Sequence, residues 1–202
     1  MNLKKLVTAA VCTMLMAAVA FTAGCGGEKK SDKKVLKVGM ECAYAPYNWS
    51  QTKADGGAVK IAGSNEYAYG YDVMMAKKLA DSMGADLEIH KIEWDGLAPA
   101  VVSGKIDAAI AGMSITSKRK ETVDFTKPYY YATVVALVKK DSEQAKAQSV
   151  ADLKGSVATS QLNTIWYDQI DQVPDVKKLP AIDTVPGMIV ALTSGKCNLI
   201  VT

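Results

Sequence analysis

Histidine and cysteine are scarce in this 202-residue chain, which contains one His and four Cys. A structural zinc site needs several such side chains close together, and the sequence has no Cys/His cluster. We therefore expect no metal site and no cofactor. Cys12 and Cys25 fall near the N-terminus, which leaves Cys42 and Cys197 for the folded part. Two distant cysteines make no disulfide framework, so we expect each to be a small buried hydrophobic residue.

An excess of positive charge is also missing once the first residues are set aside. The formal net charge is +3, and Lys4 and Lys5 contribute two of these charges. Without residues 1–24, 22 basic residues stand against 21 acidic ones. A chain this close to neutral, with no basic patch, gives no indication of nucleic-acid binding.

Arginine is nearly absent, since Arg119 is the only one among 24 Lys and Arg residues. Its planar guanidinium can hold a carboxylate with two parallel hydrogen bonds, whereas lysine offers a flexible point charge. Thr116 can cap a short helix running to Asp124, with Arg119 in its first turn, where the helix dipole also favours an anion. The segment is a candidate carboxylate receptor. The alternative is a lone surface arginine at an exposed helix end.

The N-terminal residues are typical of an export signal. Lys4 and Lys5 precede an apolar run over residues 6–21, which is shorter than the ~20 residues that span a bilayer as a helix. The small residues before Cys25 resemble the lipobox of bacterial lipoproteins, although Thr22 stands where an aliphatic residue is usual. We expect residues 1–24 to be a lipoprotein signal peptide, Cys25 to be lipidated and residues 25–34 to form a flexible tether. The alternatives are an ordinary signal peptide or a membrane anchor.

The rest of the chain alternates short apolar runs with segments of helical period. This pattern predicts an α/β fold. Strands are expected at residues 35–39, 87–90, 106–110 and 157–159, with a β-rich run over 129–139. Helices are expected at residues 71–83, 97–103, 164–172 and 185–193.

Residues 100–110 align with residues 191–201, and both read as a helix, a Ser-Gly-Lys turn and an apolar strand. Unless this is a chance use of the same helix stop, the chain contains two lobes of similar build. We expect residues 35–130 to form lobe 1, and residues 131–202 to form a crossover strand and part of lobe 2. Thr202 then corresponds to Ala111, so the second lobe is expected to be incomplete in this chain.

Five motifs follow one another along the chain. They are ECAYAPY at residues 41–47, GYDV at 70–73, WDGL at 94–97, AGMSIT at 111–116 followed by Arg119, and DFTKPYY at 124–130. With the lipobox, they resemble the polar amino-acid-binding proteins of bacterial ABC importers, solute-binding protein family 3. AGMSIT is most similar to the arginine- and basic-amino-acid-binding members.

The resemblance implies a two-lobed periplasmic-binding-protein-like fold with a hinge. It implies an extracytoplasmic protein, lipid-anchored to the cell membrane, whose partners are a free amino acid and the membrane subunits of an ABC permease. The protein would bind a polar amino acid between its lobes, one with a basic, arginine-like side chain, and deliver it to the permease.

The resemblance also implies how the ligand's backbone groups are held. The α-carboxylate would meet the Arg119 guanidinium, the Ser114 N–H and the Thr164 N–H, although Leu162 stands where the family often has glycine. The α-ammonium would meet the Ser114 hydroxyl, the Gly112 carbonyl and an acidic side chain beyond Thr202. Thr116 belongs to the same loop.

Two rings and a carboxylate would hold the ligand's side chain. Tyr44 and Trp94 would enclose it, because ring faces contact an aliphatic stem and attract a cationic group. Glu41 would pair with a distal ammonium or guanidinium. The alternatives are core packing for each ring and an exposed strand-end charge for Glu41.

An enzyme on the same fold, similar to the cyclohexadienyl dehydratases, is the alternative function, because fold alone does not decide function. His90 is the only histidine, and it follows a predicted strand away from the five motifs without an acid-base partner. We therefore expect a binding protein and no enzyme.

Overall fold

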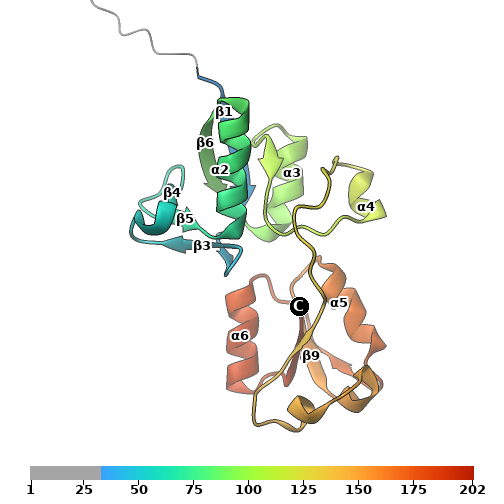
Figure 1. The fold of residues 1–202 in the computed structure, drawn as a ribbon. Coiled ribbons are helices and arrows are strands. Elements are labelled where there is room, and N and C mark those ends of the chain that lie inside the picture. The colour runs from blue at the N-terminus through green and yellow to red at the C-terminus, as the bar shows by residue number, and fades with distance from the viewer. Residues whose placement is uncertain (1–32) are drawn as a thin grey trace, which may run out of the picture. The chain divides into compact units, whose positions relative to one another are not determined.

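The computed structural model describes residues 33–202, of which residues 34–202 form one compact unit. The expected signal peptide, Cys25 and nearly all of the expected tether lie outside the described residues. The strands of the compact unit form three separate sheets, and the helices lie beside them (Figure 1).

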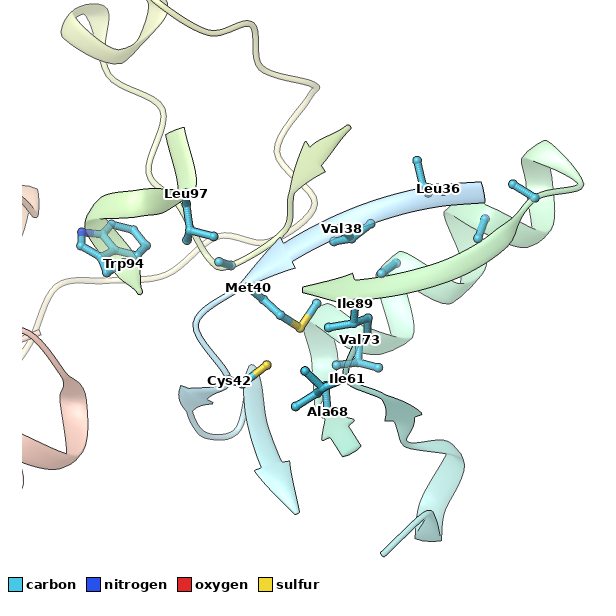
Figure 2. Close-up of a cluster of buried hydrophobic side chains, with 14 residues drawn as sticks. Leu36, Val38, Met40, Cys42, Ile61, Ala68, Val73, Ile89, Trp94 and Leu97 are labelled. Atoms are coloured by element: carbon cyan, nitrogen blue, oxygen red, sulfur yellow. The ribbon is translucent and has the colours of Figure 1, made fainter. Parts of the chain in front are cut away.

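The first sheet is parallel and lies at the start of lobe 1. Its order is β6 (Asp86–Lys91), β1 (Val35–Met40) and β7 (Ala108–Ala109). Alternate residues of β1, Leu36, Val38 and Met40, are buried as the alternation along a strand requires. They meet residues of β6 and of helix α2 (Tyr71–Met83) in one hydrophobic cluster (Figure 2).

A second, antiparallel sheet adjoins this cluster. Its order is β2 (Ala43–Tyr44), β3 (Asn48–Gln51), β5 (Tyr67–Tyr69) and β4 (Val59–Lys60). Ala68 of β5 is fully buried in the cluster of the first sheet. Because β5 pairs with β3 and β3 pairs with β2, this burial also holds Tyr44 of β2 in place, close after the end of β1.

Gly70 joins the antiparallel sheet to α2 at a point where no side chain fits. Its φ is 129°, and a Cβ there would lie 2.3 Å from the Tyr47 carbonyl oxygen. This close approach lets the Asp72 N–H donate to that same oxygen at 2.8 Å. The start of α2 is thereby attached to the 44–47 turn.

The sheet of lobe 2 has the order β10 (Lys177–Lys178), β9 (Val157–Thr159), β11 (Leu199–Val201) and β8 (Ala136–Leu137). β9 pairs in parallel with β10 and β11, and β8 is antiparallel to β11. Helices α5 (Ile165–Gln169) and α6 (Val185–Ser194) contribute to two hydrophobic clusters beside this sheet.

The two lobes repeat one arrangement, as the Ser-Gly-Lys alignment predicts. In lobe 1 the helix α3 (Leu97–Val102) is followed by Gly104 with φ 72° and then by β7, which pairs in parallel with β1. In lobe 2, α6 is followed by Gly195 with φ 82° and then by β11, which pairs in parallel with β9. The orders β6-β1-β7 and β10-β9-β11 correspond.

Several predicted elements are shorter than expected. The helix expected from Thr116 to Asp124 is only the four-residue α4 (Ser117–Lys120), and none of its side chains is buried. The β-rich run at residues 129–139 contains only β8, and the strand at 106–110 only β7. The helix at 164–172 divides into α5 and a 3₁₀ turn, Ile170–Gln172. Further 3₁₀ turns are Asp55–Gly57, Trp94–Gly96, Glu143–Lys146 and Val150–Leu153.

The two remaining cysteines behave as expected, since both are buried and free. Burial raises the pKa of the Cys42 thiol to about 12 and also raises the pKa of Cys197. None of the helices within residues 33–202 has the length and apolar character needed to cross a membrane.

Candidate binding site

Arg119 lies on α4 at the end of the 112–116 loop. The Thr116 hydroxyl caps this helix as predicted, accepting a hydrogen bond from the Arg119 N–H at 3.1 Å. The guanidinium donates through Nη1 to the Ser114 carbonyl at 2.7 Å and through Nη2 to the Asn163 carbonyl at 2.9 Å. Its carbon lies 5.4 Å from the centre of the Trp94 ring.

No carboxylate within residues 33–202 forms an ion pair with this guanidinium. Arg119 is half-buried, and burial lowers its pKa. Two backbone carbonyls therefore accept from a partly desolvated cation that can donate five hydrogen bonds. The arrangement leaves donors for an anion.

Glu41 directly follows β1 and is buried, with 4% of its surface exposed. Its two carboxylate oxygens each accept a hydrogen bond from the amide nitrogen of Gln161, both at 3.1 Å. Burial raises the pKa of Glu41, the Gln161 hydrogen bond lowers it and nearby Glu93 raises it further. The exposed strand-end reading of Glu41 is wrong, because the segment that begins at Gln161 covers it.

Trp94 and Tyr44 contact different residues. Trp94 lies beside Leu97 at the edge of the lobe 1 cluster (Figure 2). The Arg119 guanidinium lies over the face of its ring. The Tyr44 ring lies 4.8 Å from the Tyr47 ring and 6.1 Å from the Trp166 ring, measured between centroids. Among the described ring contacts, none joins Tyr44 to Trp94.

Thr164 is the N-cap residue of α5, as Thr116 is of α4. Its hydroxyl accepts from the Tyr167 N–H at 3.4 Å and donates to the Gln161 carbonyl at 2.8 Å. The left-handed residue of this loop is Asn163, with φ 54°, and not Leu162. Asparagine tolerates that conformation better than most residues, so the loop forms without the glycine that the family often has at 162.

A polar network that runs from the buried Asn48 and Asp72 to the exposed Gly112 holds the start of the 112–116 loop. The Gly112 N–H donates to the Tyr129 hydroxyl at 2.9 Å, and that hydroxyl donates to Asp72 Oδ1 at 2.7 Å. Asn48 Nδ2 donates to Asp72 Oδ2 at 2.7 Å, and the Cys42 N–H donates to Asn48 Oδ1 at 2.8 Å. Burial raises the pKa of Asp72 and of Tyr129, while hydrogen bonds from Tyr129 and Asn48 oppose the shift at Asp72.

This network links the loops that carry Glu41 and Gly112 to α2 and to the segment after α4. Sequence reasoning assigned no role to Asn48, Asp72 or Tyr129, although Asp72 and Tyr129 fall inside two of the five motifs. Gln161 and Trp166 were also missed. Gln161 had no signal of its own, since its partner lies 120 positions away.

A cavity of about 650 Å³ shares three lining residues with the candidate site. Tyr44, Gly112 and Ser114 line it, together with aromatic and aliphatic residues that include Tyr47 and Trp166. Lys127 is the only charged residue in its wall. Glu41, Trp94, Thr116, Arg119 and Thr164 do not line this cavity. These charged groups are thus separate from this mainly apolar cavity.

No group of three or more His, Cys, Asp or Glu residues within 33–202 could hold a metal ion. His90 lies on β6, where its Nε2 is 2.6 Å from Glu88 Oε1. The site consists of a guanidinium, a buried carboxylate with the Gln161 amide on it, hydroxyls, backbone groups and rings.

A model of the bacterial extracellular solute-binding proteins, family 3, matches residues 36–182. The chain belongs to this family. It is 30% identical over 197 residues to the ABC transporter arginine-binding protein 1 of Escherichia coli K12, covering 97% of this chain and 70% of that protein. It is 33% identical over 140 residues to the arginine-binding extracellular protein ArtP of Bacillus subtilis 168, covering 69% of this chain and 49% of that protein.

Solved structures of the family share the fold. An ancestral arginine-binding protein bound to arginine is 32% identical, with a TM-score of 0.70 and coverage of 84% of this chain and 70% of that one. The ancestral amino acid-binding protein AncCDT-1, a precursor of cyclohexadienyl dehydratase, is also 32% identical, with a TM-score of 0.70 and coverage of 83% and 69%. The predicted two-lobed α/β fold of periplasmic binding proteins is confirmed, as is the predicted family.

Proposed function

We propose that this protein is the extracytoplasmic substrate-binding component of an amino-acid ABC importer. It binds a polar amino acid with a basic, arginine-like side chain between its lobes and presents it to the membrane permease. Relatives named as arginine-binding proteins of ABC transporters support this assignment.

The observation that carries the proposal is the state of Arg119. This guanidinium is partly desolvated, it contacts backbone carbonyls and a ring face, and no carboxylate of the described residues pairs with it. Charged groups removed from water are normally paired, so the site favours an anionic ligand group. An amino acid's α-carboxylate has the planar shape that a guanidinium holds best.

The other site residues have matching roles in this proposal. Ser114 and Gly112 offer backbone and hydroxyl groups to the α-carboxylate and α-ammonium, Thr116 holds the loop, and the Thr164 N–H meets the carboxylate from lobe 2. Tyr44 and Trp94 contact the ligand's side chain. Glu41 pairs with its distal cation.

A thermal-shift screen of the twenty amino acids against the purified protein tests the proposal, followed by calorimetry on those that bind. We expect arginine and lysine to raise the melting temperature most and to bind with micromolar affinity. Failure of every amino acid to bind would overturn the function. Binding of only acidic or only aliphatic amino acids would overturn the assigned ligand class.

An enzyme is the second candidate, because the chain resembles a precursor of cyclohexadienyl dehydratase. We propose that the protein has no such activity, since the only histidine pairs with Glu88 and lies outside the residues assigned to the ligand. Incubation of the purified protein with a prephenate-like substrate should give no product. Turnover above the uncatalysed rate would reverse this assignment.

The proposal also includes a lipid anchor at Cys25, after removal of residues 1–24. The cationic start, apolar run and small residues before Cys25 support it. Cells that express the protein should incorporate labelled palmitate into it and retain it in the membrane fraction. Cys25→Ala should abolish both, and unchanged labelling would contradict the anchor.

A further inference from the structure

Gln161 is a buried polar residue that hydrogen-bonds to Glu41, the carboxylate assigned to the ligand's cationic group. Only 2% of its surface is exposed. Its amide nitrogen donates to Glu41 Oε1 and Oε2, both at 3.1 Å, and to the Asp183 carbonyl at 3.0 Å. One neutral NH₂ group therefore faces three oxygens at once.

The orientation of this amide follows from its surroundings. The flipped amide would set its oxygen against three acceptors, which would leave four unsatisfied oxygens together. The backbone around it is also fixed. The Thr164 hydroxyl donates to the Gln161 carbonyl at 2.8 Å, and the Leu162 N–H donates to the Ile182 carbonyl at 3.0 Å. Gln161 thus holds its side chain toward lobe 1.

Glu41 has no positive partner within residues 33–202. Both of its oxygens share one nitrogen, so that nitrogen sits at the edge where a guanidinium or ammonium binds a carboxylate. A cation can use the same edge only if the Gln161 amide moves away. The opposing effects of burial and of the Gln161 bond on the pKa of Glu41 agree with this contact.

We propose that Gln161 is a specificity-determining residue that competes with the ligand's cationic group for Glu41. This inference rests on the proposed function and deepens it. A cation displaces the amide because it adds the attraction of an opposite charge to its hydrogen bonds with the carboxylate, whereas the amide is neutral. An uncharged side chain gains nothing from the exchange. The amide therefore lowers the affinity of any ligand that must displace it from Glu41, and only a cationic side chain offsets that cost.

Gln161→Met tests this directly, because methionine keeps the length and volume of the side chain and removes the donor. The variant should bind arginine about tenfold more tightly than the wild type in calorimetry, since the ligand no longer displaces a bond to a carboxylate. Weaker binding would mean that Gln161 positions Glu41 for the ligand, and unchanged affinity would mean that no competition exists. Either result overturns the proposal.

A double-mutant cycle separates this role from a general structural one. In a Glu41→Gln background, Gln161→Met should change arginine affinity by less than about threefold, because the competition needs the charged carboxylate. An equal gain in both backgrounds would show that Gln161 acts elsewhere, and would overturn the proposal. Gln172→Met, at an exposed position of a 3₁₀ turn, is the matched control and should leave affinity unchanged.

A second variant covers the case in which Gln161→Met does not fold. Gln161→Asn keeps an amide but shortens the side chain by one methylene, so its nitrogen no longer reaches Glu41. The same tightening is expected, and its absence counts against the proposal. If the wild type binds no amino acid, the proposed function and the role of Gln161 both fail. If the wild type binds arginine and neither variant binds it more tightly, only the role of Gln161 fails.

Discussion

Single residues decide what this site can hold, and its two charged groups each depend on a contact distant in sequence. Arg119 has the acceptors Ser114 and Asn163, and Glu41 has the donor Gln161. Each charged group is thus held by neutral partners. Neutral partners stabilise a charge less than an opposite charge does. Arg119 and Glu41 therefore favour replacing these partners with the carboxylate and the cationic side chain of a bound amino acid.

Arg119→Lys should weaken arginine binding by about 10- to 100-fold, because lysine cannot form two parallel charge-assisted hydrogen bonds worth about 1.5–3 kcal/mol each. Calorimetry measures the loss, and the unfolding midpoint should barely move. Lys118→Ala, on the exposed part of the same short helix, is the control. Unaltered affinity in Arg119→Lys would remove this residue from the carboxylate site.

Glu41→Gln should cost affinity for arginine and lysine and leave neutral amino acids nearly unaffected, since only a cationic side chain loses an ion pair. We expect a loss of at least tenfold, equivalent to about 1.4 kcal/mol. Competition titrations with arginine and with a neutral amino acid give the comparison. Equal losses for both ligands would contradict a role in side-chain recognition.

The pH dependence of binding should follow the raised pKa of Glu41. Burial, the largest cause, lifts this pKa above the ordinary value of 4.5, and a bound cation would lower it again. As the pH falls through the raised pKa, a proton replaces the charge that the cation needs. Arginine affinity should therefore fall with pH while still above pH 4.5, by at most tenfold per unit. Glu41→Gln should lack this fall, and a wild-type affinity that is flat down to pH 4.5 would contradict it.

At the scale of elements, local signals predicted where helices lie and tertiary pairing decided how long the strands are. The expected helix at 71–83 is α2, because Gly84 in a left-handed conformation stops it. The run at 129–139 has β-branched and aromatic residues typical of a strand, yet only Ala136 and Leu137 pair with β11. The chain between α4 and β8 contains no other strand. A sequence pattern does not distinguish a paired strand from an extended segment that crosses between the lobes.

The candidate loop was located by motif, but the polar network behind it was not. Its bonds join residues separated by 24 and 57 positions, such as Asn48 to Asp72 and Tyr129 to Asp72. No local periodicity carries such information. The roles of Arg119, Glu41 and the other site residues stay predictions.

Tyr129→Phe tests this network, because the hydroxyl donates to the buried Asp72 carboxylate and accepts from the Gly112 N–H. Its loss should lower the free energy of unfolding by about 1.5–3 kcal/mol and weaken ligand binding through the loop. Urea unfolding and calorimetry measure the two effects. Tyr131→Phe, at a residue that is 82% exposed, should change neither. A Tyr129→Phe variant as stable as the wild type would show that the network contributes little.

At the scale of the whole molecule, the two lobes repeat one βα arrangement, and the site uses a loop from each. The segment from Gln161 to Asn163 bonds to Glu41, to Arg119 and, through Asn163 Nδ2 at 3.0 Å, to Asp95. All three partners belong to lobe 1. A ligand that replaces some of these bonds therefore couples binding to the contact between the lobes.

A crystal structure of the protein with arginine tests the central claim most directly. The account predicts one arginine molecule with its α-carboxylate on the Arg119 guanidinium and its own guanidinium on Glu41, with the Gln161 amide displaced from that carboxylate. Arginine bound in the apolar cavity beside Tyr47, or with its carboxylate away from Arg119, would contradict the account.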